Sequence, residues 1–379
     1  MASLFLPLFV PKGIPVVQLV HHVHQDQFDT RFSRPMAALG RYLEGTVSQA
    51  VYGARTIAAV SPSTRLELRR LGVRGPIEIV PNGTIDVPGR VGPRNPDPTI
   101  TVVSRLVPHK RIDILLGQVA VAATAIPRLR VEIVGSGPEH ARLERLSMDL
   151  GLASLVTFHG YQPDQVRNAL LNRAWLTVCT SDAEGWGCSI IEAAAWGVPC
   201  VALRVAGIRD SVVDGRTGWL VDSPKELGAS LLSAVAAISD ARVRSSISSA
   251  CQDWARCFSW ERSAELLAGV LLDEQGAPGR RRFALDRSGI QSDMSTVARF
   301  VRPEGADLGG LLRGTDEMAE RGGIVSALLK GRDEFEASAL IRRLGVTQAE
   351  MWAASRCDLL AGPSSGFGLW TRPDLDQKG

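Results

Sequence analysis

Two carboxylates and two cations have types and spacings that suit the binding of a phosphorylated ligand. Glu184 lies in a glycine-flanked loop, and Glu192 follows eight residues later in the first turn of an expected helix. Arg105 and Lys110 stand five residues apart after an earlier apolar strand. The cations can offset the charge of a diphosphate, and the amides of a helix N-terminus supply fixed donors. The sequence therefore favours a diphosphate site.

Glycines follow two further expected strands. Gly135 and Gly137 in the segment GSGP let backbone N–H groups approach a ligand, because glycine has no Cβ atom. Gly160 and Tyr161 follow the strand VTFH. Both segments are candidates for the edge of the same site.

Each of these signals also has a plain structural explanation. Ser189 and Glu192 fit the Ser-x-x-Glu capping box, in which the glutamate only stabilises the start of a helix. A single GxG after a strand is often a tight turn, and Arg105 and Lys110 are equally explained as loop charges in water. A capping box does not explain Glu184, which stands among glycines that allow close approach of a ligand.

The elements that must position these residues alternate along the chain. Residues 15–82 predict strand, helix, strand, helix, strand, and residues 99–221 predict a repeated strand–helix pattern. Such alternation indicates a parallel, doubly wound sheet, which binds ligands at the carboxyl ends of its strands. Residues 91–98 predict a linker, and residues 275–282 predict another after a helical stretch that ends near Asp273.

Composition and charge exclude several classes of protein. The chain has 379 residues, 45% of them hydrophobic and 22% charged, which excludes disordered and collagen-like chains. A net charge of +3 is too small for a protein that binds nucleic acid by neutralising phosphates. No apolar run reaches the ~18–20 residues that span a bilayer. The six cysteines form no CxxC pair, and His21, His22 and His24 point to different faces, so we expect no metal site.

Five segments in order and spacing resemble a known family. They are SRLVPHKR, VEIVGSGP, VTFHGY, EGWGCSIIEAAAWGVPCVA and DGRTGWLV. Together they resemble the nucleotide-sugar half of the retaining family 4 glycosyltransferases, over residues 99–272, and residues 15–90 resemble the end of the acceptor domain. The resemblance implies an α/β chain of the GT-B fold, with two Rossmann-like doubly wound domains.

The resemblance also implies roles for the candidate residues. Arg105 and Lys110 would hold the donor diphosphate, and Glu184 would contact sugar hydroxyls. Glu192 would contact the ribose, and His21 matches a histidine that lines the sugar site. The catalytic group is therefore predicted as His21, Glu184, Arg105 and Lys110. Further donor contacts are predicted at loop residues: Gly135, Gly137, Gly160, Tyr161, Gly187, Cys188 and Ser189.

The expected organisation has four parts. Residues 1–90 would form a partial acceptor-side domain, and residues 99–255 the donor-binding domain. Residues 256–273 would be a helix that returns to the first domain, and residues 283–379 a small α/β extension. The first part lacks the strand and glycine-rich loop with which the family's acceptor domain begins. We therefore expect either a longer natural chain or a partner chain that completes the sheet.

The implied function is transfer of a sugar from a UDP- or GDP-linked donor to an acceptor, with retention of the anomeric configuration. We expect no cofactor and no metal, a lipid-linked or polysaccharide acceptor, no nucleic-acid partner, and a cytoplasmic location. The alternative is a GT-B remnant without catalysis that binds a nucleotide or a partner protein. An epimerase or hydrolase of nucleotide sugars is disfavoured, because the sequence offers no additional acid–base groups.

The stretch 25–55 suggests contact with the inner face of a membrane. It interleaves apolar and basic side chains, namely Phe28, Phe32, Met36, Leu39, Arg31, Arg34 and Arg41. Such a pattern can seat a helix at an anionic lipid surface. The alternative is an ordinary amphipathic helix that packs on the acceptor-side domain.

Two further patterns receive structural interpretations. Residues 311–345 resemble the end of a diguanylate-cyclase domain, but the acidic residues that bind metal are absent, so we predict a packed module without chemistry. Trp175, Trp196 and Trp219 fall in strand or helix patterns and are predicted to lie in the core. Trp186 is the candidate for stacking against a sugar.

Overall fold

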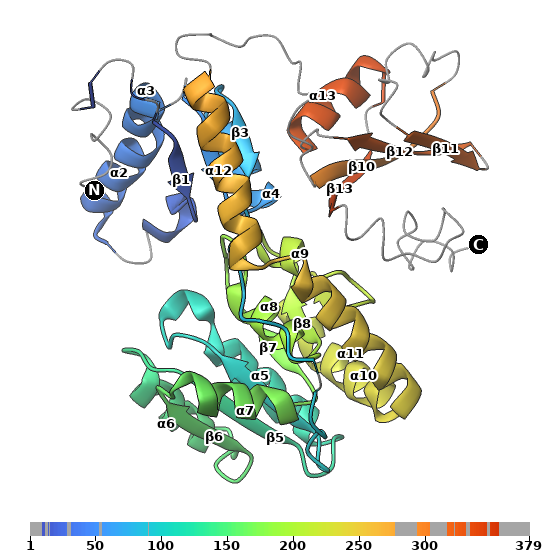
Figure 1. Cartoon of the computed structure of the whole chain (residues 1–379). Coiled ribbons are helices and arrows are strands. Elements are labelled where there is room, and N and C mark those ends of the chain that lie inside the picture. The colour runs from blue at the N-terminus through green and yellow to red at the C-terminus, as the bar shows by residue number, and fades with distance from the viewer. Residues whose placement is uncertain are drawn as a thin grey trace. The chain divides into compact units, whose positions relative to one another are not determined.

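The computed structural model describes residues 10–11, 14, 16–28, 32–52, 55–89, 91–276, 294–303, 317–321, 323–330, 334–346 and 349–355 (Figure 1). The chain divides into two compact units. Residues 82–263 form the central unit, and residues 1–81 with 264–379 form the terminal unit.

The central unit contains a parallel sheet in two halves. One half has the strands β4 (Thr99–Val103), β5 (Arg130–Val134) and β6 (Val156–Gly160), and the other has β7 (Thr177–Cys179), β8 (Cys200–Leu203) and β9 (Gly218–Val221). An isolated parallel bridge between Ile100 and Leu176 joins the halves, and the Thr101 amide donates to the Leu176 carbonyl over 3.0 Å. The strand order is therefore β6-β5-β4-β7-β8-β9, the doubly wound order of a Rossmann fold.

Helices alternate with these strands, as the sequence pattern predicts, and two more helices follow the last strand. They are α5 (Ile112–Ala123), α6 (His140–Asp149), α7 (Asp164–Arg173), α8 (Cys188–Ala195), the short α9 (Ile208–Ser211), α10 (Leu227–Ser239) and α11 (Ala241–Arg256). Helix α11 begins at Asp240, whose carboxylate accepts the amides of Arg242 and Val243 over 2.7 and 3.1 Å. This cap fixes the turn between α10 and α11.

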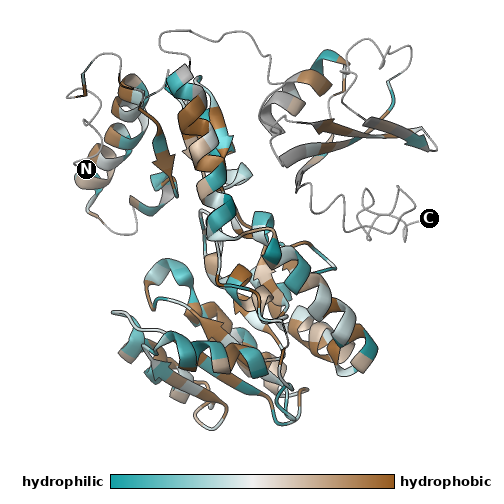
Figure 2. Cartoon of the chain, viewed as in Figure 1, coloured by the Kyte–Doolittle hydropathy of each residue, from teal (hydrophilic) through white to brown (hydrophobic). Residues whose placement is uncertain are grey.

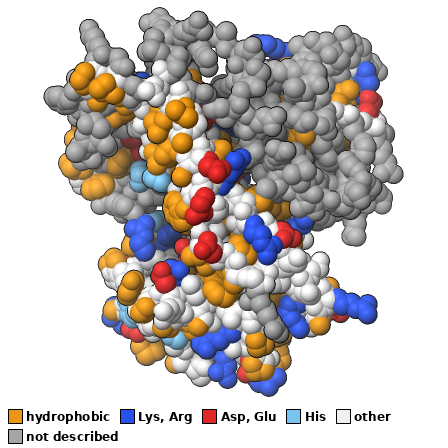
Figure 3. Space-filling model, viewed as in Figure 1, with side chains coloured by type: hydrophobic (Ala, Val, Ile, Leu, Met, Phe, Trp, Pro, Cys, Tyr) orange, Lys and Arg blue, Asp and Glu red, His pale blue; other side chains and the backbone are white. Residues whose placement is uncertain are grey.

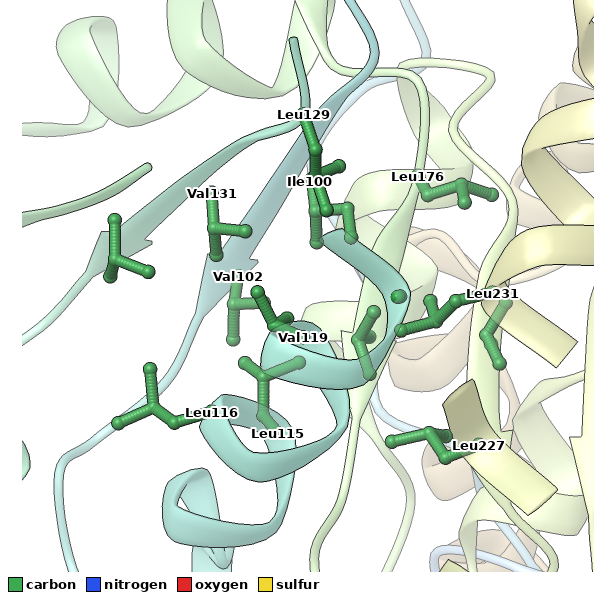
Figure 4. Packing of buried hydrophobic residues seen from close by; sticks show 14 of the residues in the cluster. Ile100, Val102, Leu115, Leu116, Val119, Leu129, Val131, Leu176, Leu227 and Leu231 are labelled. Atoms are coloured by element: carbon green, nitrogen blue, oxygen red, sulfur yellow. The ribbon is translucent and has the colours of Figure 1, made fainter. Parts of the chain in front are cut away.

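The largest core cluster lies between the sheet and helices α5 and α10. Figure 4 shows Leu115, Leu116 and Val119 of α5 beside Val102 and Val131 of the strands. All five side chains are at most 2% exposed. Strand β5 is accordingly brown in Figure 2, whereas the surface helix α7 is mostly teal and white.

Residues 91–98, which the sequence predicts as a linker, belong instead to the central unit. Arg94 donates to the carbonyls of Asn172, Trp196 and Gly197 over 2.7–2.9 Å. These carbonyls end helices α7 and α8, where no further backbone donors follow. Burial lowers the pKa of Arg94 to about 10. The segment forms no helix or strand, as predicted, but the boundary expected there was wrong, because Arg94 binds the ends of two helices and the division between units falls at residues 81/82.

The terminal unit contains a smaller parallel sheet of β1 (Gln18–Val20), β2 (Ile57–Ala59) and β3 (Ile77–Ile79). Its helices are η2 (Gln25–Gln27), α2 (Arg34–Tyr42), α3 (Ser48–Tyr52), α4 (Pro62–Arg70) and most of α12 (Trp260–Gly276). A π-helical turn, η3 (Leu43–Val47), separates α2 from α3, where the sequence predicts one continuous helix. Helix α12 packs Val270 against Ala58 and Val80 of this sheet region.

A C-terminal module forms an antiparallel sheet of order β11-β12-β10-β13. The strands are β10 (Met294–Val301), β11 (Glu317–Arg321), β12 (Ile324–Lys330) and β13 (Glu350–Ser355), and helix α13 (Glu334–Arg343) packs against one face. This module lies within residues 283–379, which the sequence predicts as a small α/β extension. Residues 277–282 of the expected second linker and residues 356–379 lie outside the described residues. Within the described residues, no helix is both long and apolar enough to cross a membrane.

A matched pair of glycine substitutions tests the strand–loop packing of the central unit. Gly135 has a φ of +138°, and a Cβ atom there would collide with the Ser104 carbonyl, whereas a Cβ on Gly117 in α5 meets open space. We expect Gly135→Ala to lower the free energy of unfolding by at least ~1–3 kcal/mol, the cost of strained backbone alone. Gly117→Ala should raise it by ~0.5–1 kcal/mol. Urea denaturation measures both, and a neutral Gly135→Ala would contradict the packing described.

Candidate functional site

The candidate site lies where the order of the sheet reverses. Strands β4 and β7 are neighbours, but their following helices lead to opposite halves of the sheet. The loops after these strands therefore diverge at their carboxyl ends, which is where doubly wound folds bind ligands. Residues 104–111 and 180–187 form these two loops.

Hydrogen bonds join the two loops directly. The Thr180 hydroxyl lies 3.0 Å from the Lys110 carbonyl and 2.9 Å from the Arg111 carbonyl, and shares its hydrogen between them. The Asp182 amide donates to the His109 carbonyl over 2.9 Å. The loop after β7 therefore fixes the position of the loop that carries Lys110.

Oppositely charged side chains pair across the same junction. The Lys110 ammonium is bound to the Glu184 carboxylate, and these side chains are 15% and 18% exposed. The Ser181 hydroxyl donates to the same carboxylate oxygen over 2.8 Å. Arg111 Nη1 lies 3.2 Å from Asp182 Oδ1. Arg111 also contacts Asp113 in the first turn of α5 over 3.2 Å, so both cations of the junction are paired with carboxylates.

Contacts with the loop after β8 fix the backbone of Glu184. Its amide donates to the Ala206 carbonyl over 3.3 Å, in the loop that follows β8. Gly207 has a φ of +74°, and a Cβ atom there would collide with the Glu184 carbonyl. On the opposite loop, Arg111 adopts a left-handed φ of +49°, which is unusual for a residue with a side chain. Such strained positions cluster at functional sites.

Arg105 is placed differently from Lys110. It lies in the extended part of the loop, whereas Lys110 ends the short η4 turn (Pro108–Lys110). Arg105 is exposed and forms no ion pair with any described residue. It is therefore the cation of this loop whose charge is not balanced by a neighbouring carboxylate.

Helix α8 begins at the junction with free amide groups. Gly187 is its N-cap, with a φ of +64°, and no side chain caps the helix. The amides at the start of α8, at Cys188 and Ser189, have no partner within the helix, because the first amides of any helix lack one. The Cys188 side chain is exposed, and its sulfur accepts from Asn82 Nδ2 over 3.6 Å. This N-terminus suits an anionic group.

Glu192 does not act as a cap. Because α8 begins after Gly187, Glu192 is the fifth residue of the helix and lies beyond reach of the N-cap. Its carboxylate lies 4.0 Å from Arg167 Nη1 on α7. Burial raises the pKa of Glu192, and the nearby Arg167 opposes the rise. The capping-box explanation is therefore wrong, and so is the placement of Glu192 in the first turn.

The glycines of the GSGP segment pack against neighbouring backbone, so not all of their amides are available to a ligand. The Gly135 amide donates to the Gly160 carbonyl over 2.8 Å, so it does not face a ligand. A Cβ on Gly137 would collide with the Leu106 carbonyl. Both glycines permit the close contact of two loops, and the expectation of a ligand-facing amide is corrected for Gly135, whereas the amide of Gly137 stays a prediction. Gly160 itself has a φ of +65° with open space beside it, and Tyr161 is 78% exposed.

Two further candidate residues are Trp186 and His21. Trp186 is 4% exposed and its ring lies 4.8 Å from that of Phe258, so the proposal that it stacks on a sugar is wrong. Phe258 in turn contacts Trp254, which makes an aromatic cluster behind the loop. His21 follows β1 in the terminal unit and is exposed. No group of three or more His, Cys, Asp or Glu that could hold a metal occurs among the described residues.

Sequence reasoning missed several residues that build the junction. They are Arg111, Thr180, Ser181, Asp182 and Gly207. Thr180 and Ser181 end an apolar strand, and Gly207 follows the strand Cys200–Leu203, so their place at carboxyl strand ends was a usable signal. The partners of Thr180 and Asp182 could not be read from the sequence, because these contacts join segments about 70 residues apart.

Two family models match successive parts of the chain. Residues 87–243 match the model described as Glycosyl transferases group 1, and residues 2–86 match the model described as Glycosyltransferase Family 4. The chain belongs to glycosyltransferase family 4. The match to the first model covers the whole junction just described.

Curated relatives of this family 4 chain include two kinds of transferase. A GDP-mannose-dependent alpha-(1-6)-phosphatidylinositol monomannoside mannosyltransferase of Mycolicibacterium smegmatis is 32% identical over 185 residues, 45% of this chain and 48% of that protein. A D-inositol 3-phosphate glycosyltransferase of Mycobacteroides abscessus is 35% identical over 207 residues, 50% of this chain and 43% of that protein. The chain thus spans about half the length of the curated relatives it matches.

Solved structures show the fold of this family 4 chain. Sucrose-phosphate synthase from Thermosynechococcus elongatus matches with a TM-score of 0.57 and 23% identity, over 68% of this chain and 67% of that one. Anabaena HepE in complex with UDP and glucose matches with a TM-score of 0.56 and 22% identity, over 68% and 72%. The predicted α/β fold of the GT-B type is confirmed.

The raised pKa of Glu192 gives a test of its surroundings. Burial of Glu192 destabilises the folded chain only when its carboxylate is charged. In the folded chain it is charged at a pH above its raised pKa. Glu192→Gln should therefore unfold with a higher free energy than the wild type at neutral pH. The difference should shrink as the pH falls through the raised pKa and vanish below the ordinary glutamate range. Denaturation at stepwise lower pH measures this.

The control for this test is Glu144→Gln on α6, whose side chain is 48% exposed. It should change the free energy of unfolding by less than about 0.5 kcal/mol at neutral pH. A loss of stability in Glu192→Gln at neutral pH would contradict the burial penalty and would mean that the contact with Arg167 outweighs it.

Proposed function

We propose that this family 4 chain transfers a sugar from a UDP- or GDP-linked donor to an acceptor and retains the anomeric configuration. The observation that carries the proposal is the junction at the sheet's reversal point. There the Lys110–Glu184 pair, the exposed Arg105 and the open N-terminus of α8 belong to neighbouring loops. The relatives support the donor class, since one is named for GDP-mannose and a structural neighbour binds UDP.

The junction suits the departure of a nucleoside diphosphate. Breaking the bond between sugar and phosphate builds negative charge on the diphosphate. Arg105, Lys110 and the amides of Gly187, Cys188 and Ser189 can stabilise that charge. Because these groups take the place of a divalent cation, we propose that the reaction needs neither a metal nor another cofactor.

The two glutamates receive different roles. Glu184, held by Ser181 and Lys110, is fixed as a hydrogen-bond acceptor for sugar hydroxyls. Glu192 lies deeper on α8, and its buried carboxylate suits the hydroxyls of the ribose. Neither is proposed as a nucleophile, because Glu184 already shares its charge with a cation. Retention then comes from attack on the face that the leaving diphosphate vacates.

Two matched arginine substitutions test the donor site. Arg105→Ala should weaken binding of UDP or GDP by ~1.5–3 kcal/mol, the range for hydrogen bonds to a charged group, and should leave stability unchanged. Arg130→Ala is the control, because Arg130 begins β5 at the opposite end of the strands and is 66% exposed. Calorimetric titration of UDP and GDP measures both. Equal affinity in the two variants would place the phosphates elsewhere.

Turnover separates the transferase from a nucleotide-binding remnant. Glu184→Gln should keep nucleotide affinity within a few-fold and abolish sugar release from a panel of UDP- and GDP-sugars. NMR of the wild-type product should show the donor's anomeric configuration. A wild-type chain that binds nucleotide but releases no sugar would favour the remnant, and an inverted product would contradict retention.

The acceptor side offers a surface for lipid. Phe32 and, on α2, Met36, Leu39 and Tyr42 are 49–56% exposed at helical spacing, and Arg34 is exposed beside them. Figure 3 shows hydrophobic side chains over the region of helices α2 and α3. Phe28 is partly buried and contacts Phe32, whereas Arg31 lies outside the described residues. We propose that this face contacts an anionic membrane that carries a lipid-linked acceptor, and a cytoplasmic location stays a prediction.

Sedimentation with vesicles tests the membrane contact. The wild-type chain should bind vesicles with anionic lipid, and binding should weaken with salt, because each cation contributes about 1 kcal/mol near such a surface. Two double variants should lose binding to these vesicles. One combines Met36→Ser with Leu39→Ser, and the other combines Arg34→Ser with Arg41→Ser. The control is Val121→Ser with Met148→Ser, which removes similarly exposed apolar side chains from α5 and α6. Equal binding to neutral vesicles, or none to anionic ones, would rule the proposal out.

A further inference from the structure

A second polar cluster lies at the carboxyl end of β1, in the terminal unit. The chain leaves β1 through His21 and then forms the short η2 turn after His24. The carboxyl ends of parallel strands are where such sheets bind ligands. This cluster belongs to the terminal unit, in the segment that the Glycosyltransferase Family 4 model matches at residues 2–86, whereas the donor loops belong to the central unit.

Glu44 organises the cluster. Its two carboxylate oxygens accept the His24 amide over 2.8 and 3.0 Å, and Gln25 Nε2 donates to one of them over 3.0 Å. The His24 ring completes the set, with Nδ1 at 3.0 Å from Glu44 Oε1. Glu44 can therefore hold both the backbone and the ring of His24.

The carboxylate reaches this position from a π-helical turn. Glu44 is the second residue of η3 (Leu43–Val47), which interrupts the helix between α2 and α3. π-Helical turns are rare and occur frequently at functional sites, because the extra residue redirects a side chain. The interruption is thus explained by the placement of Glu44 against His24.

The contact with Glu44 determines which nitrogen of the His24 ring can accept a hydrogen bond. A carboxylate only accepts hydrogen bonds, so Nδ1 of His24 carries the hydrogen, and Nε2 of the neutral ring keeps a lone pair. The His24 side chain is 48% exposed, and Nε2 has no hydrogen-bond partner among the described residues. His22 packs its ring edge-on at 5.0 Å from the His24 ring, which limits its rotation.

We propose that His24 is an acceptor-binding residue, whose Nε2 accepts a hydrogen bond from an alcohol hydroxyl of the sugar acceptor, and that Glu44 is its positioning residue. The proposal rests on the function proposed above, because it names a group for the second substrate of that transfer. The chemical class it implies is a polyol or sugar alcohol. His24 binds and orients the hydroxyl, and no proton transfer to the ring is required.

The experiment uses the full chain with 15N-labelled histidine and NMR detection of ring nitrogens. The six histidines give a small set of signals, and His24→Asn identifies that of His24. The probes are glycerol and myo-inositol, titrated in the presence of saturating UDP or GDP. We expect Nδ1–H as the main tautomer and a saturable shift of the His24 Nε2 signal with at least one probe.

Two glutamate variants separate positioning from general structure. Glu44→Gln should reduce the share of the Nδ1–H tautomer and weaken the affinity for the probe about tenfold, the loss expected for one charged hydrogen bond. Glu144→Gln is the control, because Glu144 forms a similar pair with His140 on α6, with Nε2 at 3.1 Å from the carboxylate. It should change the His140 signals and leave probe affinity unchanged.

The outcomes distinguish this inference from the proposed function. A chain that binds nucleotide but shows no saturable His24 shift with either probe would overturn the role of His24 alone. Equal probe affinity in Glu44→Gln and the wild type would overturn the role of Glu44. If titration calorimetry shows no nucleotide binding at all, the proposed function fails first, whatever the His24 signal does.

Discussion

The ion pair between Lys110 and Glu184 is the interaction on which the donor site depends. Both side chains are largely buried, and a buried pair stabilises a protein only when its remaining hydrogen-bonding groups are also satisfied. Ser181 satisfies the carboxylate, and Thr180 holds the carbonyls of Lys110 and Arg111. The pair therefore requires that the loops after β4 and β7 lie in contact, and the strand order β6-β5-β4-β7-β8-β9 provides this.

Contacts outside the junction also keep these loops in place. Arg94 binds the carbonyls that end α7 and α8, so the helix that carries Glu192 is held at its far end. Trp186 anchors the loop after β7 through its contact with Phe258. Gly135, Gly137 and Gly207 permit the close loop contacts that any Cβ atom would block. Much of the sequence motif is thus required for packing, and a smaller part is free to contact substrate.

This division explains what the sequence could and could not predict. The alternation of strands and helices predicted the doubly wound sheet, because each short apolar strand needs cover on both faces. The glutamates and Lys110 were predicted from glycine-flanked segments at carboxyl strand ends and from the resemblance to family 4, and the structure pairs Lys110 with Glu184. The prediction for Trp186 was wrong because an aromatic residue in a glycine-rich loop looks exposed, whereas its partner Phe258, which also contacts Trp254, comes about 70 residues later.

The errors at Glu192 and at residues 91–98 have a related cause. Local rules offered a capping box from Ser189 to Glu192 as the alternative explanation, but the N-cap is Gly187, two residues before the position that the box requires. Proline-rich composition predicted a linker, but Arg94 supplies donors to two helix ends that are distant in sequence. The π-helical turn at Leu43–Val47 was equally invisible, since its explanation lies in Glu44 reaching His24.

Charge balance at the junction has a consequence for donor recognition. Lys110 is paired with Glu184, and Arg111 is paired with both Asp182 and Asp113, whereas Arg105 forms no ion pair with a described residue. A diphosphate carries more negative charge than one arginine offsets, so under the proposed function it must also draw on Lys110. Lys110 then shares its charge between phosphate and Glu184, and the Glu184 carboxylate becomes a better acceptor for sugar hydroxyls. Binding of the diphosphate and recognition of the sugar are coupled through one ammonium group.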